Sequence, residues 1–155
     1  MIYKLRIWIL KLLKLTGKIA LVTGGSRGIG FAIAKTLSEN GAFVVITSKD
    51  PEKIKKAESK ISNSFGIACN IKKKNEVKDV LNLIIKKFGK LDILVNNAGI
   101  FPKIKQLHEI EEEEWSEVID VNLTGQFRFT KEAIPFLKKT SGCIINISSD
   151  AGLKA

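Results

Sequence analysis

A glycine-rich break between an apolar run and a helical pattern restricts the fold of this chain more than any other feature. The apolar run covers residues 19–22, and helical spacing of apolar residues begins at Ile29. Between them, Gly24, Gly28 and Gly30 have the spacing G-x-x-x-G-x-G. Glycine adopts a positive φ without strain, and its missing Cβ lets backbone N–H groups approach a pyrophosphate at the positive end of a helix. The segment therefore predicts a strand, a phosphate-binding turn and a helix.

Two other interpretations of this turn make different demands on the sequence. A loop that binds a nucleoside triphosphate needs Lys and then Ser or Thr after its last glycine, and neither follows Gly30. A glycine-rich surface turn before an ordinary helix stays open on the glycines alone, because short glycine motifs also match by chance.

Strand-like and helix-like segments alternate along the rest of the sequence. Apolar runs predict four further strands, at residues 43–46, 66–71, 91–95 and 143–147. Helical spacing predicts helices over residues 28–40, 51–62, 75–88 and 111–137, with Trp115, Val118 and Ile119 in the core. This alternation produces right-handed βαβ units. The expected fold class is therefore α/β, with a Rossmann-type doubly wound parallel sheet in one domain, residues 16–155.

Residues 1–15 form a basic and apolar extension before that domain. Their longest apolar run, residues 7–10, is too short for a membrane span or for the core of a signal peptide. On a helical wheel, Lys4, Lys11 and Lys14 share one side. Two interpretations stay open: a helix that contacts a membrane surface or a partner, and an extension that lies on the domain or on a neighbouring subunit.

The sequence is strongly basic, with 26 Lys and Arg against 16 Asp and Glu and a formal net charge of +10. Such a charge could attract nucleic acid, a membrane surface or an acidic partner. The lysines are scattered through the helical patterns, however, and no aromatic residues alternate with them as in a base-stacking platform. This distribution favours a solvated lysine-rich surface and no nucleic-acid partner.

The cysteines and the single histidine predict neither disulfides nor a metal site. Cys69 and Cys143 both fall in predicted buried strands, at a spacing that suits neither a zinc site nor a disulfide framework. His108 has no cysteine or second histidine near it in the sequence. We therefore expect small core cysteines in a reducing, cytoplasmic compartment.

The end of the second predicted strand bears on the choice of a dinucleotide. An acidic side chain at that place binds the ribose diol of NAD, whereas basic side chains receive the 2′-phosphate of NADP. Here the strand ends in Ser48 and Lys49, and Arg27 lies in the glycine turn. NADP is favoured over NAD, although Asp50 is close enough to leave NAD open.

Three further motifs follow the glycine turn in order. Asn96-Asn97-Ala98-Gly99 comes after the fourth predicted strand, Asn122 lies within residues 121–125, and Ser148-Ser149 ends the fifth strand. With Thr23 to Gly30, these motifs make the chain similar to the short-chain dehydrogenase/reductase family over about residues 15–155. Within that family the sequence resembles the 3-oxoacyl-[acyl-carrier-protein] reductases, and sugar and steroid dehydrogenases look similar over this region.

The resemblance implies a set of site residues. The implied cofactor-binding residues are Thr23, Gly24, Ser26, Arg27, Gly28, Ile29, Gly30, Ser48, Lys49, Asn70, Ile71, Asn97, Ala98 and Gly99. Asn70-Ile71 stands where the family commonly has Asp-Val against the adenine, so the reach of the side chain is kept and its charge is lost. Asn122 matches the catalytic asparagine that holds a water in the proton relay. Ser149 matches the serine that hydrogen-bonds the substrate carbonyl or alcohol, with Ser148 as the neighbouring alternative.

The family's acid/base motif, Tyr-x-x-x-Lys, is not found in the 155 residues. The single tyrosine is Tyr3, and the sequence ends at Ala155, shortly after Ser149. We therefore expect a truncated Rossmann domain whose sheet and substrate pocket are incomplete on the C-terminal side, and a chain that is inactive alone. The alternative is a non-catalytic nucleotide-binding or partner-binding protein that ends naturally at Ala155.

For the complete enzyme, the resemblance implies hydride transfer between NADP(H) and a ketone or secondary alcohol, without a metal. The implied substrate is a small-molecule or carrier-bound carbonyl compound. The resemblance also implies a homo-oligomer, commonly a tetramer that buries the long helix over residues 111–137.

Overall fold

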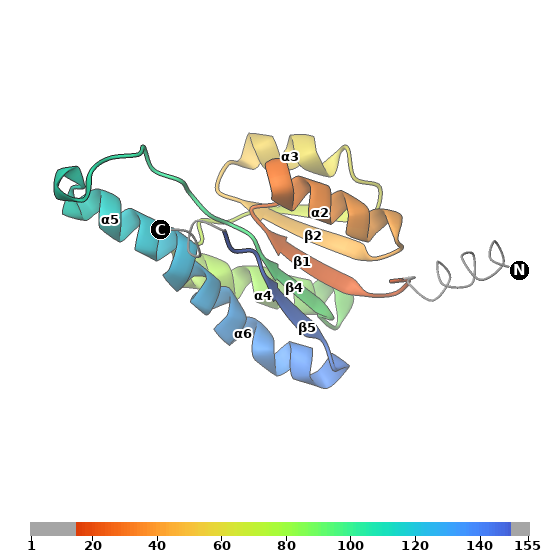
Figure 1. Ribbon diagram of the computed structural model, residues 1–155. Coiled ribbons are helices and arrows are strands. Elements are labelled where there is room, and N and C mark those ends of the chain that lie inside the picture. Colours follow the sequence, from red (N-terminus) through yellow and green to blue (C-terminus); the bar gives the residue numbers. More distant parts are fainter. Residues whose placement is uncertain (1–14, 150–155) are drawn as a thin grey trace, which may run out of the picture.

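Five parallel strands form the sheet, in the order β3-β2-β1-β4-β5 (Figure 1). The computed structural model describes residues 15–149 of the chain. The strands are β1 (Ile19–Thr23), β2 (Phe43–Ser48), β3 (Ser64–Ala68), β4 (Ile93–Asn96) and β5 (Cys143–Asn146). Strand order runs outward from the β1·β4 pair in both directions, so this pair marks the point where the topology reverses. The predicted α/β class and doubly wound parallel sheet are confirmed.

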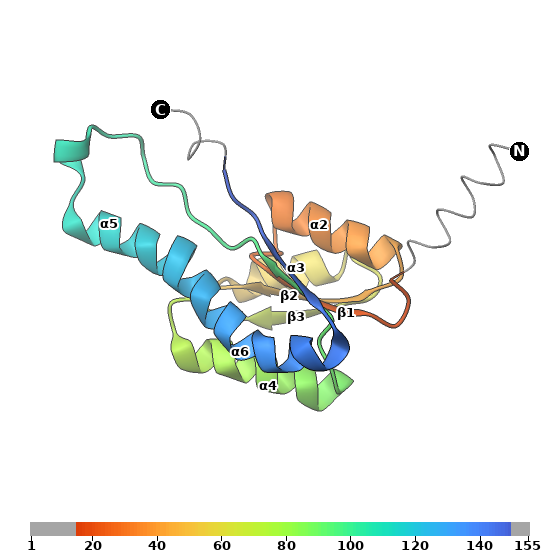
Figure 2. The same ribbon diagram turned by 60° about the horizontal axis from the view of Figure 1, so that its bottom comes forward.

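Helices cover both faces of the sheet (Figure 2). One face carries α2 (Gly28–Glu39) and α3 (Pro51–Glu58), and the other carries α4 (Lys74–Phe88) and α6 (Gly125–Thr140). Before α6 come α5 (Glu112–Ile119) and the π-helical turn η2 (Asp120–Thr124), and the three form one rod that extends past the sheet. The helical stretch predicted over residues 111–137 is thus present, with a π turn inside it. No helix within residues 15–149 has the length and apolar character needed to cross a membrane.

The central strands bury side chains on both faces, which explains why they appear in the sequence as unbroken apolar runs. Leu21 and Leu94 belong to the larger core cluster, which includes residues of α4 and α6. Their neighbours Val22 and Val95 belong to the second cluster, which includes residues of α2 and α3. Two cores therefore hold the carboxyl ends of β1 and β4 in fixed positions.

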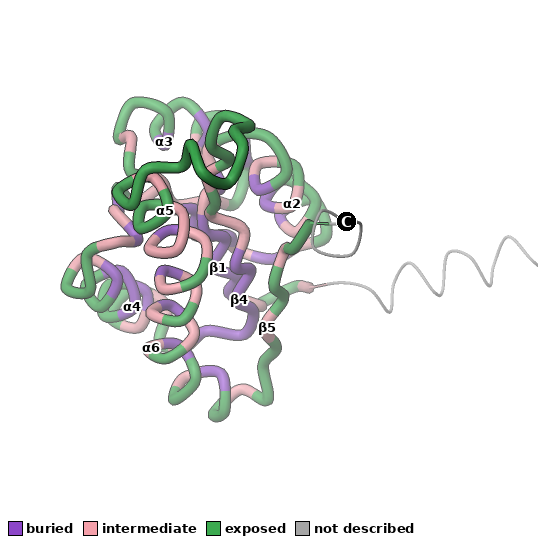
Figure 3. Tube along the Cα trace, turned by 60° about the vertical axis from the view of Figure 1, so that its left-hand side comes forward, coloured by how far each residue is buried: buried purple, intermediate pink, exposed green. Residues whose placement is uncertain are grey.

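One prediction about the edge strand β5 is wrong. The sequence predicts a buried Cys143, but this residue is exposed, and Ile145 of the same strand is 45% exposed. Among the described strands β5 pairs with β4 alone, and Figure 3 shows much of it in the colour of exposed residues. Cys69 is buried as predicted, and burial raises the pKa of its thiol to about 12. A strand's own sequence does not tell whether a second neighbour covers it.

The third strand differs from its predicted position. The sequence predicts a strand over residues 66–71, whereas β3 ends at Ala68 and leaves Asn70 and Ile71 in the turn that leads to α4. The backbone N–H of Asn70 donates to Glu76 Oε2 at 2.7 Å, and its carbonyl accepts from Lys73 N at 2.8 Å. Asn70 thus forms hydrogen bonds with the start of α4 instead of pairing with a neighbouring strand.

The prediction that the apolar residues of α5 lie in the core is also wrong. Trp115 is 57% exposed, and Val118 and Ile119 are only half-buried, although the sequence predicts all three in the core. The helix lies past the edge of the sheet, as Figure 1 shows, so the described elements cover only part of its surface. Helical spacing identified the helix correctly but could not indicate what packs against it.

Residues 1–14 lie outside the described residues, and both interpretations of the N-terminal extension concern that segment. The described part begins with Leu15. Its backbone N–H donates to the carbonyl of Asn40 at 2.8 Å, and its side chain packs against the cluster under α2 and α3.

A buried carboxylate ties the amino ends of β1 and β4 together. The Asp92 side chain is 3% exposed and accepts a hydrogen bond from the backbone N–H of Ile19 at 2.9 Å. Its two oxygens also meet the ammonium groups of Lys18 at 3.0 Å and Lys90 at 3.2 Å. Burial acts to raise the pKa of the Asp92 carboxyl, but these three donors outweigh it, and the pKa lies below its ordinary value. The charged form is therefore the one that the fold stabilises.

We expect Asp92→Asn to reduce the free energy of unfolding at pH 7 by about 1–3 kcal/mol, since the buried donors lose a charged acceptor. The pKa of Asp92 is lower in the folded than in the unfolded chain, so its contribution is present above the unfolded value and is lost as the pH falls through the folded value. Urea unfolding at pH 7 and at about pH 3 measures the difference. A loss of stability as large in acid as at neutral pH would contradict this account.

Candidate active site

The hydroxyl of Thr23 joins the carboxyl ends of β1 and β4. This fully buried oxygen donates to the carbonyl of Val95 at 3.3 Å and accepts from the backbone N–H groups of Asn97 at 2.9 Å and Ala98 at 3.0 Å. One hydroxyl thus uses its donor and two acceptor positions on the neighbouring strand and the loop that follows it. The glycine turn and the loop over residues 97–99 are held side by side as a result.

The Asn97 side chain fastens the glycine turn to the same loop. Its Nδ2 donates to the carbonyls of Thr23 at 2.9 Å and Gly24 at 3.3 Å. Gly24 has φ +65°, and a Cβ there would lie 2.9 Å from the Cα of Ala98. Only glycine fits between these two backbones. The predicted residues Thr23, Gly24, Asn97 and Ala98 therefore come together in space.

The first turn of α2 leaves its backbone N–H groups available to a ligand. Arg27 at the N-cap makes no side-chain cap bond, and no acidic residue lies in the first turn. Gly28 has φ +55°, and a Cβ built on it would meet nothing within 4 Å. Open space thus lies before a helix start whose partial positive charge is uncompensated, and a phosphate group is its natural complement. These residues fit the pyrophosphate of a dinucleotide.

Asp50 is engaged by its own helix. Its Oδ1 accepts from the backbone N–H of Lys53 at 3.0 Å, which caps α3, and its Oδ2 pairs with the Lys53 ammonium at 2.8 Å. The hydrogen bonds from the side chain and then the backbone of Lys53 lower the pKa of the Asp50 carboxyl. Lys49 beside it is exposed, and Ser48 Oγ accepts from Asp50 N at 3.3 Å. The carboxylate of Asp50, two residues after the end of β2, is therefore already bound.

Asn70 has mainly local contacts, whereas Ile71 packs in the core against α6. Asn70 Oδ1 accepts from the backbone N–H of Lys72 at 3.1 Å. Ile71 is buried in the larger core cluster and lies so close to Gly125 that a Cβ there would be 2.5 Å from it. Their side chains shape the turn between β3 and α4, at the carboxyl edge where the predicted site lies.

Asn122 lies in the π turn η2 and binds the backbone of one residue twice. Its Oδ1 accepts from Ile100 N at 2.8 Å, and its Nδ2 donates to Ile100 O at 2.9 Å. A Cβ on Gly99 would be 3.4 Å from the same oxygen. Single π turns inside α-helices are frequent at functional sites. Asn122 therefore fixes the loop that continues from residues 97–99, and both ends of its side-chain amide are in use.

The predicted serines follow β5, at the same edge of the sheet. Ser148 and Ser149 are exposed and come just after Ile147, whose N–H donates to the carbonyl of Asn96 at 2.8 Å. Parallel strands bring their carboxyl ends to one edge, so the serines share that edge with the glycine turn.

The resemblance to the family implies that Asn96 helps to brace the central sheet, but its partners could not be predicted from the sequence. This residue is fully buried, and its Nδ2 donates to Thr130 Oγ1 at 2.9 Å and to Asn146 Oδ1 at 2.8 Å. Its Oδ1 has no partner among the described residues. The pair Asn96 and Asn146 was recognisable only as one residue in each of two motifs, since their register across β4 and β5 depends on the fold.

Two hollows border the glycine turn and the end of β2. One is a groove of about 280 Å³ between α2 and α3, lined by Ser26, Arg27, Phe31, Lys53, Lys56, Ala57 and Lys60. The other, of about 470 Å³, lies beside the loop that connects β4 to η1 and α5. The residues that line it include Lys49, Ile100 and Glu117. Within residues 15–149, no group of three His, Cys, Asp or Glu side chains is placed to hold a metal ion.

Comparison with known proteins gives one consistent family. The family model for short chain dehydrogenase matches residues 18–155. A 3-oxoacyl-[acyl-carrier-protein] reductase of Staphylococcus epidermidis is 43% identical over 141 residues, which are 87% of this chain and 57% of that protein. The L-fucose dehydrogenase of Bos taurus is 37% identical over 136 residues, which are 88% of this chain and 50% of that protein. The chain thus spans about half the length of the curated relatives it matches.

A solved structure agrees with the sequence relatives. The crystal structure of 3-ketoacyl-(acyl-carrier-protein) reductase from Brucella melitensis complexed with NADH superposes with a TM-score of 0.87 at 35% sequence identity. The match covers 90% of this chain and 60% of that one.

The two later glycines of the turn should respond differently to the same substitution. In Gly30→Ala the methyl would lie 2.5 Å from the Gly24 carbonyl oxygen and against the Asn97 amide, and we expect a loss of about 2–4 kcal/mol from overpacking and a broken hydrogen bond. In Gly28→Ala the methyl meets nothing within 4 Å beyond its own turn of the helix, so only the positive φ is penalised, by about 1 kcal/mol. Thermal unfolding of both variants measures the order. A larger loss at Gly28 would show that the turn is packed differently.

Proposed function

The chain belongs to the short chain dehydrogenase family, and from that premise we propose that the complete protein transfers a hydride between NADP(H) and a ketone or secondary alcohol. The family's enzymes are oxidoreductases that use NAD or NADP, and bound coenzyme supplies the hydride donor or acceptor. The observation that carries the proposal is the junction of the glycine turn with residues 97–100 and Asn122, all at the carboxyl edge of the sheet. Open α/β sheets bind ligands at the carboxyl ends of their strands, at the point where the strand order reverses. In this sheet that point is the β1·β4 pair.

The coenzyme-binding residues are proposed to act mainly through their backbones. Residues 24–30 present N–H groups to the pyrophosphate, while Thr23 and Asn97 hold that turn in place. Residues 97–99 form the wall opposite the turn. Asn70 and Ile71 border the adenine, Asn70 without the charge that an aspartate would bring.

We propose NADP as the coenzyme because the carboxylate that NAD would need is engaged elsewhere. Asp50 caps α3 and pairs with Lys53, so binding a ribose diol would require both contacts to break. Arg27 is exposed in the glycine turn, and Lys49 is exposed at the end of β2. A 2′-phosphate would meet cations on this side of the turn.

Asn122 and Ser149 are proposed as the catalytic residues within this chain. The Asn122 amide is bound to Ile100 at both ends, so we assign the water of the proton relay to its main-chain carbonyl in the π turn. Ser149, or Ser148 beside it, would hydrogen-bond the substrate oxygen. The alkoxide that hydride transfer creates must also be protonated, and a phenol needs a neighbouring cation to serve as that acid near neutral pH.

For the substrate, we propose a 3-oxoacyl group on a carrier protein. The support is the identity with 3-oxoacyl-[acyl-carrier-protein] reductases and a net charge of +10, which suits an acidic carrier. The 37% identity with L-fucose dehydrogenases makes a sugar the second candidate.

We propose that the complete protein is a homo-oligomer, and specifically a tetramer. The support is the row of exposed apolar side chains on the rod of α5, η2 and α6, which includes Trp115, Leu123 and Phe127. Exposed apolar patches of this kind mark association surfaces in soluble proteins.

The second candidate function is a non-catalytic nucleotide-binding or partner-binding protein. In its favour, Tyr3 is the only tyrosine of the 155 residues. The reading frame after Ala155 separates the two candidates: a downstream Tyr-x-x-x-Lys supports the enzyme, and a stop codon directly after Ala155 supports the binding protein.

The complete protein should bind NADPH more tightly than NADH, since Arg27 faces the side of the turn where the 2′-phosphate would lie. We expect a ratio of dissociation constants of at least about 10, corresponding to roughly 1.4 kcal/mol. Titration followed by the fluorescence of the reduced nicotinamide measures both affinities, and Arg27→Gln should reduce the ratio. Equal affinities of the unaltered protein would refute the assignment to NADP.

The 155-residue chain alone should not reduce ketones, because its sequence does not contain the Tyr-x-x-x-Lys motif whose tyrosine would protonate the alkoxide. NADPH oxidation in the presence of a 3-oxoacyl thioester gives the rate, and an intact 3-oxoacyl-[acyl-carrier-protein] reductase serves as the control. Turnover comparable to the control would mean that another group supplies the proton.

A further inference from the structure

The chain enters the sheet at the edge opposite the candidate active site. Residues 1–14 join the described part of the chain at Leu15, shortly before β1 begins at Ile19. Because β1 runs from this amino edge to the glycine turn, the length of the strand separates Leu15 from the proposed coenzyme site. A partner of residues 1–14 would therefore meet the domain first at its amino edge.

Exposed lysines gather at the same edge. A helix that connects parallel strands runs back along the sheet, so α3, α4 and α6 end where the strands begin. At the end of α4, the ring centroid of Phe88 lies 4.7 Å from that of Phe43, the first residue of β2. After α6, the backbone N–H of Cys143 donates to the carbonyl of Asp92, just before β4, at 3.0 Å. The exposed lysines at or just after these helix ends are Lys60, Lys86, Lys87, Lys138 and Lys139.

The positive charge of this amino edge is largely uncompensated. Within residues 15–149, none of these lysines forms an ion pair with a carboxylate. The Asp92 carboxylate is buried and already has two lysine partners. Two further acidic residues lie at helix ends here, the half-buried Glu58 and Glu39, which pairs with Lys35 at 3.8 Å. The amino edge is therefore a basic face of the domain.

Helix dipoles alone can account for these lysines, because cations offset the partial negative charge at helix ends. A second observation, from the sequence, points to a partner. Residues 1–14 contain Lys4, Arg6, Lys11 and Lys14, no acidic residue, and otherwise only apolar or aromatic side chains. This segment adds both positive charge and apolar surface next to an edge that is already basic.

The domain offers residues 1–14 no apolar surface at the amino edge. The large apolar side chains that are exposed within residues 15–149 lie elsewhere: on the loop after β4, on α5, η2 and α6, on β5, at the start of α2 and midway along α4. Packing of residues 1–14 on the amino edge would therefore bring cations and apolar side chains against lysines. Nucleic acid would match the charges but would leave the apolar side chains in water. A partner that is both anionic and apolar matches both properties.

We propose that residues 1–14 and the lysines of the amino edge together bind the surface of an anionic lipid membrane. The apolar side chains of residues 1–14 enter the boundary between headgroups and acyl chains, and the lysines of the amino edge face the anionic headgroups. The glycine turn then lies on the side of the domain away from the membrane, so that coenzyme and substrate reach the site from water. This inference does not depend on the proposed function.

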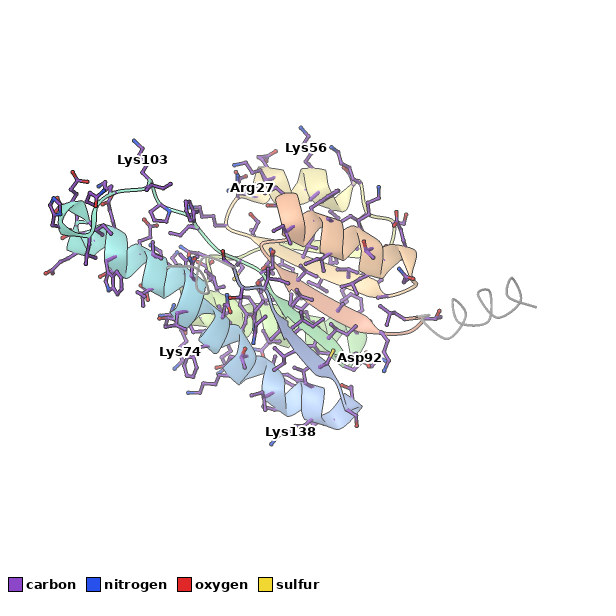
Figure 4. The ribbon with its side chains drawn as sticks, viewed as in Figure 1. Arg27, Lys56, Lys74, Asp92, Lys103 and Lys138 are labelled. Carbon is purple, nitrogen blue, oxygen red and sulfur yellow. The ribbon has the colours of Figure 1, made fainter. Side chains whose placement is uncertain are left out.

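Cosedimentation of the complete protein with lipid vesicles tests the proposal. One set of vesicles contains phosphatidylcholine alone, and the other contains equal parts of phosphatidylcholine and phosphatidylglycerol. The first variant lacks residues 1–14, and the second carries Lys138→Gln with Lys139→Gln. The matched control carries Lys74→Gln with Lys78→Gln, which removes two exposed lysines without ion pairs from the first part of α4. Figure 4 shows Lys138 and Lys74 in different parts of the molecule, Lys138 near the end of α6 and Lys74 at the start of α4. Thermal unfolding confirms that each variant is folded.

We expect the unaltered protein to bind the mixed vesicles at least about tenfold more tightly than phosphatidylcholine alone, and salt should weaken this binding. Loss of residues 1–14 removes both apolar and charged contacts and should weaken binding at least about a hundredfold. A lysine near anionic lipid strengthens binding about fivefold, so the double variant on α6 should lose at least that factor. The control on α4 should change the affinity by less than about twofold. The affinity for NADPH should stay within about twofold when the vesicles are present, because the carboxyl edge faces water.

Four results would overturn the inference. Equal losses in the α6 variant and the α4 control would mean that only net charge attracts the protein and that the amino edge has no special part. Binding to neither kind of vesicle, with a changed oligomeric state after loss of residues 1–14, would assign this segment to a neighbouring subunit. Tighter binding of a short DNA duplex than of the mixed vesicles would assign the cations to nucleic acid. A loss of NADPH affinity on the vesicles would mean that the carboxyl edge, and not the amino edge, faces the lipid.

Discussion

The buried hydroxyl of Thr23 is the contact on which the rest of the site depends. Through its bonds to Val95, Asn97 and Ala98 it sets the distance between the ends of β1 and β4. Asn97 can then reach the carbonyls of the glycine turn, and the helix start of α2 faces open space. An isolated glycine turn has many conformations. The three hydrogen bonds of the Thr23 hydroxyl restrict these conformations, so the turn is already ordered before a ligand binds.

The same principle extends to the other side of the site. Asn122 lies in η2, the π turn between α5 and α6, and its side chain binds both the N–H and the carbonyl of Ile100. The loop after β4 is thus held at two points, by Thr23 at its start and by Asn122 just beyond Gly99. Both anchors are side chains that bond to backbone, which leaves the loop's shape insensitive to the side chains it carries.

Local features of the site could be predicted from the sequence, and long-range ones could not. The glycine turn was predictable because its requirement for missing side chains acts within one segment, and the structure brings Gly24 against Ala98 as that requires. The exposure of Cys143 and Trp115 was not predictable, since it depends on which elements lie beside β5 and α5. The role of Asp50 could be predicted in part. An acidic residue before Pro51 is a recognisable helix cap, but that the cap engages the carboxylate nearest the proposed ribose site follows only from the hydrogen bonds.

The engagement of Asp50 links two properties that are usually considered separately. The carboxylate that begins α3 is also the group that would have to turn toward a ribose diol if the protein were to prefer the unphosphorylated coenzyme. Losing an N-cap destabilises a helix by about 1 kcal/mol. If NADP is the coenzyme, as proposed above, evolution toward NAD at this position would therefore require a substitute cap for α3, so that the two changes would tend to be acquired as a pair.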